Sequence, residues 1–113
     1  MKKISKSFVK KYLPKRSKLS SKIESGKVLI IAGAKGFYGA GILSALAATR
    51  CGVGYTHLMT DLSEFPWLKF PDFIVHPISL GELKKGHECV IAMGPGMGIS
   101  NKKRDLLGYL IKN

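Results

Sequence analysis

Hydrophobic residues are gathered along the chain in short runs, which are separated by glycine-rich or charged stretches. The run at residues 28–33 has no polar position, as is typical of a strand buried on both faces of a parallel sheet. Further strands are predicted at residues 55–59, 73–76 and 89–93. The pattern therefore predicts an α/β domain with a parallel sheet.

Helical periodicity occurs between these strands and after the last of them. Residues 40–50 are rich in small side chains, which let a helix approach a sheet closely. With the flanking strands they form a βαβ unit, which is right-handed with parallel strands in nearly all cases. Residues 61–70 and 81–88 are predicted to be connections. A second helix is predicted at residues 101–112, with four apolar side chains on one face, Leu106, Leu107, Leu110 and Ile111.

The first 27 residues differ from the rest of the chain. A short amphipathic helix is predicted that ends at Pro14, because proline cannot continue an interior helical turn. The favoured interpretation is that this helix packs its apolar stripe on the body. The alternative is that it binds a membrane surface or RNA. The apolar positions are Ile4, Phe8, Val9, Tyr12 and Leu13.

The charge is concentrated in the same segment. The 113 residues carry a formal net charge of +12, and residues 1–27 hold ten Lys and Arg against the single acid Glu24. Residues 28–113 hold nine Lys and Arg against six acids, which is a more ordinary balance. We therefore divide the chain into a basic N-terminal arm, residues 1–27, and an α/β body, residues 28–113. Nucleic-acid binding through the arm is the lesser expectation, because net charge alone is a weak signal.

Cysteine and histidine provide no recognisable site. Cys51 and Cys89 lie in apolar runs and are predicted to be buried, reduced thiols. The three histidines lack metal-ligand spacing, so no metal site is predicted. No apolar run is long enough to span a membrane, and no secretory signal is recognisable. The expected location is the reducing cytoplasm.

Two glycine-rich loops each follow a predicted strand and precede a predicted helix. We call residues 33–40 the first glycine loop and residues 94–98 the second glycine loop. In open parallel sheets ligands bind outside the carboxyl ends of the strands, and backbone N–H groups at a helix start favour phosphate. The two loops are therefore predicted to line one anion- or nucleotide-binding crevice, although tight turns without a ligand remain the alternative. The phosphate-loop candidates are Gly33, Ala34, Lys35 and Gly36.

The glycine spacing in the first loop fits neither the dinucleotide fingerprint nor a P-loop. Beyond the second loop, the basic run at residues 102–104 is expected to be a solvated charge cluster. The alternative is that this run helps to hold a phosphate near Gly98.

Several segments together resemble one known family. They are residues 28–40 (VLIIAGAKGFYGA), 43–54 (LSALAATRCGVG), 71–77 (PDFIVHP) and 94–98 (GPGMG), with residues 13–16 (LPKR) as a lead-in. In this order and spacing they resemble the N-terminal half of the ADP/ATP-dependent NAD(P)H-hydrate dehydratases, over roughly residues 13–113. Ala34 departs from the pattern, because the family usually has serine there.

The resemblance implies a fold and an activity. The fold would be ribokinase-like, a three-layer Rossmann-like parallel sheet, of which this chain holds the N-terminal half. The activity would be that of a lyase that dehydrates hydrated NADH or NADPH, written NAD(P)HX, driven by ADP or ATP with magnesium. The resemblance places the substrate contacts at Gly39, Ala40, Gly94, Pro95, Gly96 and Gly98.

One family element is missing from this chain. The catalytic aspartate of the family lies in a Gly-Ser/Thr-Gly-Asp motif in the C-terminal half, and no such motif occurs here. We therefore expect a truncated or split dehydratase that is inactive alone, and we predict no catalytic residue. Its partner would be a second chain with the C-terminal half, or further copies of itself. The main alternative is a catalytically dead domain that binds a nucleotide or self-assembles.

Overall fold

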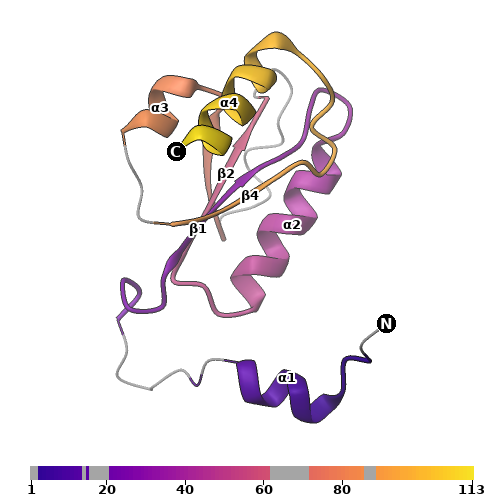
Figure 1. The fold of residues 1–113 in the computed structure, drawn as a ribbon, viewed down its shortest axis with the longest axis vertical. Coiled ribbons are helices and arrows are strands. Elements are labelled where there is room, and N and C mark those ends of the chain that lie inside the picture. Colours follow the sequence, from indigo (N-terminus) through magenta and orange to yellow (C-terminus); the bar gives the residue numbers. More distant parts are fainter. Residues whose placement is uncertain (1–2, 14, 16–20, 62–71, 86–88) are drawn as a thin grey trace.

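The computed structural model describes residues 3–13, 15, 21–61, 72–85 and 89–113 (Figure 1). Its strands form one sheet in the order β3-β2-β1-β4, and every neighbouring pair is parallel. The strands are β1 (Lys27–Ile31), β2 (Tyr55–Thr60), β3 (Ile74–Pro77) and β4 (Val90–Met93). The helices are α1 (Lys6–Tyr12), α2 (Tyr38–Arg50), α3 (Leu80–Lys84) and α4 (Asn101–Lys112).

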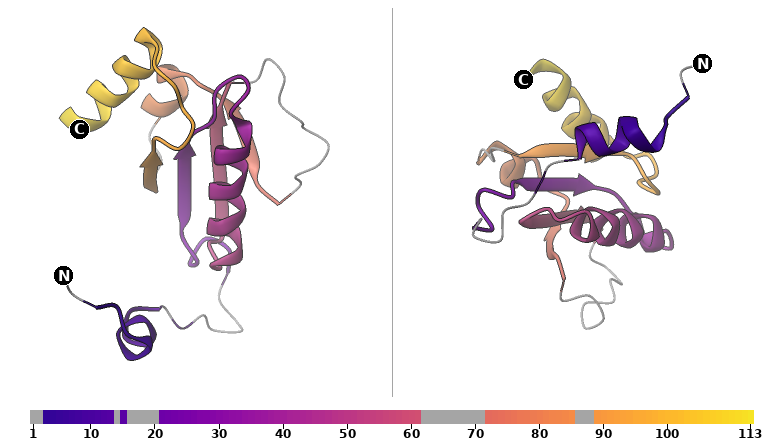
Figure 2. Two further views of the ribbon diagram at one scale, coloured as in Figure 1. Left: turned by 90° about the vertical axis from the view of Figure 1, so that its right-hand side faces the viewer. Right: turned by 90° about the horizontal axis from the view of Figure 1, so that it is seen from below.

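The sheet is the middle layer of three. Helix α2 lies on one face, and α3 and α4 lie on the other (Figure 2). Because side chains alternate along a strand, Ile30 packs in the core with Ala45 of α2, whereas Ile31 packs in a second core with Leu106 of α4. The predicted three-layer parallel sheet is confirmed.

Helix α2 lies close against the sheet, as its small residues predict. A Cβ added at Gly41 would lie 3.3 Å from the backbone carbonyl of Ala32 and 3.3 Å from Leu58 Cδ1. The helix ends at Arg50, and the backbone N–H of the C-cap residue Cys51 donates to Ala47 O at 3.0 Å. Cys51 is exposed at this position, so the prediction that it is buried is wrong, while Cys89 is partly buried.

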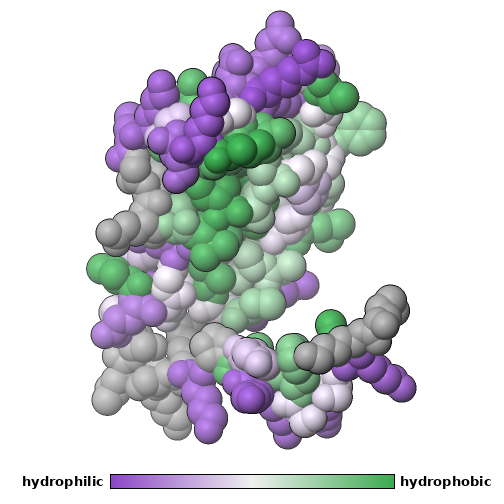
Figure 3. Space-filling view, in the orientation of Figure 1, coloured by the Kyte–Doolittle hydropathy of each residue, from purple (hydrophilic) through white to green (hydrophobic). Residues whose placement is uncertain are grey.

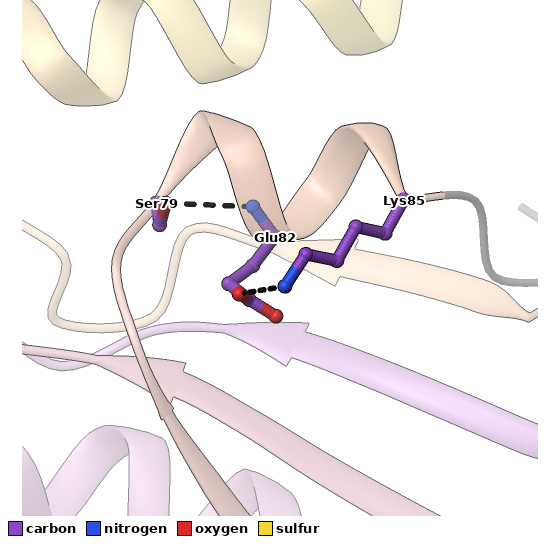
Figure 4. Close-up of polar contacts among 3 residues, drawn as sticks. All are labelled: Ser79, Glu82 and Lys85. Atoms are coloured by element: carbon purple, nitrogen blue, oxygen red, sulfur yellow. Dashed lines mark hydrogen bonds and ion pairs between the residues drawn. The ribbon is translucent and has the colours of Figure 1, made fainter.

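Helix α3 lies in a segment that was predicted to be a polar connection. Its start is capped by Ser79, whose Oγ accepts a hydrogen bond from Glu82 N at 3.4 Å, and Glu82 pairs with Lys85 at 2.5 Å (Figure 4). Leu83 is the buried residue that attaches the helix to the core. Five residues are too few to show a helical period, so the pattern of apolar positions missed this element.

Helix α1 forms where the sequence predicts it, but it does not pack on the body. Ser5 caps its start by accepting from Phe8 N at 3.2 Å, and the Phe8 and Tyr12 rings lie 4.7 Å apart. No residue of α1 is buried, and both core clusters are complete without it. Figure 2 shows the helix set apart from the sheet. The favoured interpretation of its apolar stripe is therefore wrong.

Candidate functional site

The strand order creates a reversal between β1 and β4. The chain adds β2 and then β3 on one side of β1, and it places β4 on the other side. In open α/β sheets a crevice forms at such a reversal, outside the carboxyl ends of the strands. The first glycine loop leaves β1 and the second glycine loop leaves β4. Strand order therefore brings the two predicted loops to the same crevice, although they are some 60 residues apart in the sequence.

Backbone hydrogen bonds hold the two loops together. Gly33 N donates to Pro95 O at 2.9 Å, and Gly94 N donates to Ile31 O at 3.0 Å. The carbonyl of Gly33 accepts from Thr60 Oγ1 at 3.1 Å, and Thr60 is fully buried. The start of the first glycine loop is thus attached both to the second glycine loop and to the end of β2. The N–H of Gly33 is engaged within the protein.

Glycine at position 96 lets the loops approach each other closely. Gly96 has a φ of +60°, and a Cβ added there would lie 2.8 Å from Ala40 Cβ and 2.9 Å from Phe37 O. Gly98 has a φ of +64°, and its Cβ position lies 3.7 Å from Ala34 Cβ. The second glycine loop therefore packs along the first through backbone surfaces that a side chain would separate.

The remaining predicted site residues lie on the open side of the loops. Three of them are exposed in the first glycine loop, namely Lys35, Gly36 and Gly39. Gly94 and Pro95 are exposed in the second glycine loop. Helix α2 starts within the first loop, where Phe37 at the N-cap provides no side-chain hydrogen bond and the first turn holds no acid. Such a helix start favours a negatively charged ligand group.

Lys103 belongs to this region, although the basic run was expected to be solvated. Its ammonium donates to the carbonyl of Met97 in the second glycine loop. The same Nζ lies 3.7 Å from the Cβ position of Gly98, and Lys103 is partly buried. Lys103 thus lies near Gly98, where the alternative interpretation of the run expects a phosphate to be held, and the phosphate itself stays a prediction.

His57 and His76 lie away from the loops. His57 of β2 and His76 of β3 form a hydrogen bond of 2.8 Å between Nδ1 and Nε2, and their rings are stacked with centroids 5.1 Å apart. With Glu82 they line a small cavity on the α3 side of the sheet. Across the described ranges, no group of three His, Cys, Asp or Glu is arranged to hold a metal ion. His87 lies outside those ranges.

Comparison with known proteins decides the family. The family model for NAD(P)H-hydrate dehydratase matches residues 28–113, which include both glycine loops. The chain belongs to the NAD(P)H-hydrate dehydratase family. It is 35% identical, over 118 residues, to an ADP-dependent (S)-NAD(P)H-hydrate dehydratase of Listeria monocytogenes, and the match covers 99% of this chain and 42% of the relative. It is 33% identical to a bifunctional NAD(P)H-hydrate repair enzyme of Methanocaldococcus jannaschii, covering 89% of this chain and 22% of that one.

Solved structures agree on the fold. A ribokinase-like superfamily protein of Enterococcus faecalis matches with a TM-score of 0.81 at 26% identity, covering 96% of this chain and 40% of its own. An ADP/ATP-dependent NAD(P)H-hydrate dehydratase of Bacillus subtilis, co-crystallised with ATP and Mg²⁺, matches with a TM-score of 0.77 at 24% identity. It is likewise covered only in part, over 41% of its length. The chain thus has a ribokinase-like fold and spans less than half of the dehydratases that it matches.

None of the helices in the described residues has the length and apolar character needed to cross a membrane.

Proposed function

We propose that this chain forms the substrate-binding wall of an NAD(P)H-hydrate dehydratase and that its two glycine loops bind NAD(P)HX. The observation that carries the proposal is the packing of the two loops at the β1–β4 reversal, where Gly33 N donates to Pro95 O and Gly96 lies against Ala40. The Listeria monocytogenes relative is named for this reaction and the Methanocaldococcus jannaschii relative for repair of the same compound, which supports the assignment of the loops to the substrate.

The proposed roles follow from the geometry of the loops. Gly94 is exposed and has no atom within 4 Å of its Cβ position, so the hydrated nicotinamide ring can approach its backbone closely, whereas Gly96 and Gly98 hold the second glycine loop against the first. Gly39 and Ala40 lie in the first turn of α2, whose backbone N–H groups are suited to a phosphate or hydroxyl oxygen of the substrate. Neither loop contains Asp, Glu or His, whose side chains most often act as general acid or base near neutral pH.

Turnover therefore needs groups from outside the loops. Removal of water from NAD(P)HX needs a proton transfer and, in this family, a nucleotide whose phosphate is cleaved. We infer that both are provided by the C-terminal part of the dehydratase fold, which lies outside residues 1–113, and that residues 1–113 by themselves do not turn over NAD(P)HX. The nucleotide would be ADP or ATP with magnesium. The described residues offer no cluster of metal ligands, so none of them is assigned to magnesium.

A second candidate function is a domain that binds a nucleotide or self-assembles without catalysis. It is supported by strand β4, which pairs with β1 on one side and has no strand partner on its other side among the described residues. Val90 at this edge is 71% exposed. Beside β4 an open groove of about 520 Å³ is lined by apolar residues that include Ile91 and Tyr109. Hydrophobic side chains gather on this face of the body (Figure 3).

The proposed location is the reducing cytoplasm, which is supported by two cysteines that are both unpaired.

Substrate binding tests the first proposal directly. NADPHX is titrated into the purified chain by calorimetry, and turnover is followed by the return of the NADPH absorbance after ADP or ATP is added. We expect binding without turnover. Turnover should appear once the C-terminal part of a relative is added. Turnover by the chain alone would disprove its proposed inactivity, and absence of NADPHX binding would disprove the substrate assignment.

A matched pair of variants locates the binding site. Gly39→Leu is compatible with folding, because no atom lies within 4 Å of its Cβ position. It adds a bulky side chain at the crevice, so we expect at least a tenfold loss of NADPHX affinity. Ala47→Leu makes a similar addition at an exposed position two turns further along α2 and should bind normally. Equal affinities for the two variants would remove Gly39 from the site.

A further inference from the structure

A second cavity lies beside the crevice. It has a volume of about 300 Å³ and opens where the carboxyl ends of β2 and β3 meet the start of α4. Its lining is polar on the α4 side and includes two lysines. The lining residues are Thr60, Asp61, Pro77, Ile78, Ser100, Lys102 and Lys103. Thr60 also donates to the carbonyl of Gly33, so this cavity and the first glycine loop share a wall.

Lys103 connects this cavity with the two loops. Its Nζ donates to the carbonyl of Met97, and it lies 3.7 Å from the Cβ position of Gly98. That Cβ position is also 3.7 Å from Ala34 Cβ in the first glycine loop. The positive charge is therefore held where the cavity, the first glycine loop and the second glycine loop meet.

The Lys103 side chain is already restricted in its conformation, unlike that of a free surface lysine, and this favours binding of an anion. An ammonium has three N–H donors, and the bond to Met97 uses one of them. Because this bond already restricts the long side chain, less conformational entropy is lost when the remaining donors bind a ligand. Lys102 lines the same cavity but is exposed.

We propose that Lys103 binds a phosphate group of a nucleotide that occupies the crevice. The proposal rests on the proposed function for the nature of the ligand. Charge-assisted hydrogen bonds from an ammonium to phosphate oxygens are among the stronger polar contacts in proteins. The start of α4 is not itself the site, because Ser100 Oγ already accepts from Lys103 N at 3.4 Å. Two nucleotides would provide this chemistry, the dinucleotide substrate with its diphosphate bridge and the ADP or ATP co-substrate.

Asp61 provides a second substitution that tests the proposal. Asp61 lines the same cavity, where a negative charge would repel a phosphate. Loss of the lysine charge and loss of the aspartate charge should therefore change the affinity in opposite directions. A net-charge effect would give the same two signs, so dependence on position is tested by Lys112→Gln, which removes the same charge in the last turn of α4.

The test uses the whole 113-residue chain and three probes, NADPH, ADP and adenosine, measured by calorimetry at low salt. We expect Lys103→Gln to weaken binding of NADPH, ADP or both by about tenfold. Lys103→Arg should retain most of the affinity, and Asp61→Asn should increase it. Lys112→Gln removes the same charge at the far end of α4 and should change the affinity less than twofold. Adenosine, which lacks phosphate, should be insensitive to all four substitutions.

The probes separate the possible outcomes. A loss that is confined to NADPH assigns Lys103 to the dinucleotide, and a loss that is confined to ADP assigns it to the co-substrate. Equal affinities of Lys103→Gln and the unchanged chain would overturn the proposal, as would absence of any phosphate-dependent binding. If binding of ADP depends on Lys103 but NADPHX does not bind, the proposed function fails while this inference stands. Circular dichroism and thermal melting confirm that each variant is folded.

Discussion

At the scale of single residues, the glycines of the two loops serve different physical purposes. Gly96 combines a left-handed backbone with close contact to Ala40 and Phe37. Gly36 has a similar φ of +81° but no atom within 4 Å of its Cβ position. Gly39 has neither constraint. The spacing of glycines in the sequence treats all three alike, because backbone conformation and crowding arise only when the loops are packed together.

The substitutions Gly96→Ala and Gly36→Ala separate the cost of a left-handed backbone from the cost of steric crowding. Both substitutions put a side chain on a left-handed backbone, which costs about 1–2 kcal/mol. Gly96→Ala in addition brings Cβ within 2.8 Å of Ala40 Cβ and 2.9 Å of Phe37 O, so it should lower the free energy of unfolding by clearly more than Gly36→Ala. Urea unfolding measures both. Equal losses would contradict the close packing of the loops.

The two thiols should differ in reactivity. Burial raises the pKa of Cys89, and the nearby charge of Lys27 offsets part of this effect. The thiolate is the reactive form, so Cys89 should need a higher pH for alkylation, whereas Cys51 is exposed at the end of α2. We expect iodoacetamide to modify Cys51 first at pH 7.5. Mass spectrometry with Cys51→Ser and Cys89→Ser as controls identifies the site, and faster labelling of Cys89 would contradict the structure.

At the scale of elements, α4 is attached to the sheet through a narrow apolar stripe. Leu106 is fully buried in the core that β1 shares with α3 and α4, whereas Leu107 is 46% exposed. The sequence predicted four apolar residues on one face, of which Ile111 is also mostly exposed. Because α4 carries Lys103, the anchoring of this helix also determines where the lysine lies relative to the second glycine loop.

Truncation of the two neighbouring leucines tests this attachment. Leu106→Ala leaves a cavity in the core and should cost about 2–5 kcal/mol of unfolding free energy. Leu107→Ala removes the same atoms from a half-exposed position and should cost about 0.5 kcal/mol or less. Thermal and denaturant melts compare them directly. If the two substitutions destabilise equally, the helix is rotated from the orientation described.

At the scale of the whole molecule, the sheet has an edge that remains accessible. The outer side of β4 has no strand partner among the described residues, and the adjoining groove is lined by apolar residues. Exposed edges and contiguous apolar surface favour association with another chain or segment. The same edge adjoins the second glycine loop, so whatever covers β4 also lies next to the proposed site.

Association through this edge is a testable consequence. We expect the chain to associate in a concentration-dependent manner in sedimentation or light-scattering experiments. Val90→Lys should weaken the association because it places a charge on the edge strand. Ile111→Lys, at a position that is 76% exposed on α4, is a control of similar exposure and should have little effect. A monodisperse monomer at all concentrations, or equal effects of the two substitutions, would contradict this prediction.

Much of the fold follows from local pattern. The pattern of apolar positions and glycines predicted the four strands within a few residues, and the small residues of 40–50 predicted α2 and its close approach to the sheet. The five-residue helix α3, the exposure of Cys51 and the unpacked face of α1 were missed. Each of these depends on what lies opposite a residue in space, and neighbouring residues in the sequence do not specify that.

The sequence by itself determined the parallel α/β class, the two glycine loops and the resemblance to the dehydratase family. These depend on the order of residue types along the chain, which is local information. The tertiary structure decided that β4 lies beside β1, so that Gly33 and Pro95 share a hydrogen bond and Gly96 packs on Ala40. It also placed Lys103 beside Gly98. Strand order and side-chain direction result from packing both faces of the sheet at once, and only the folded chain defines them.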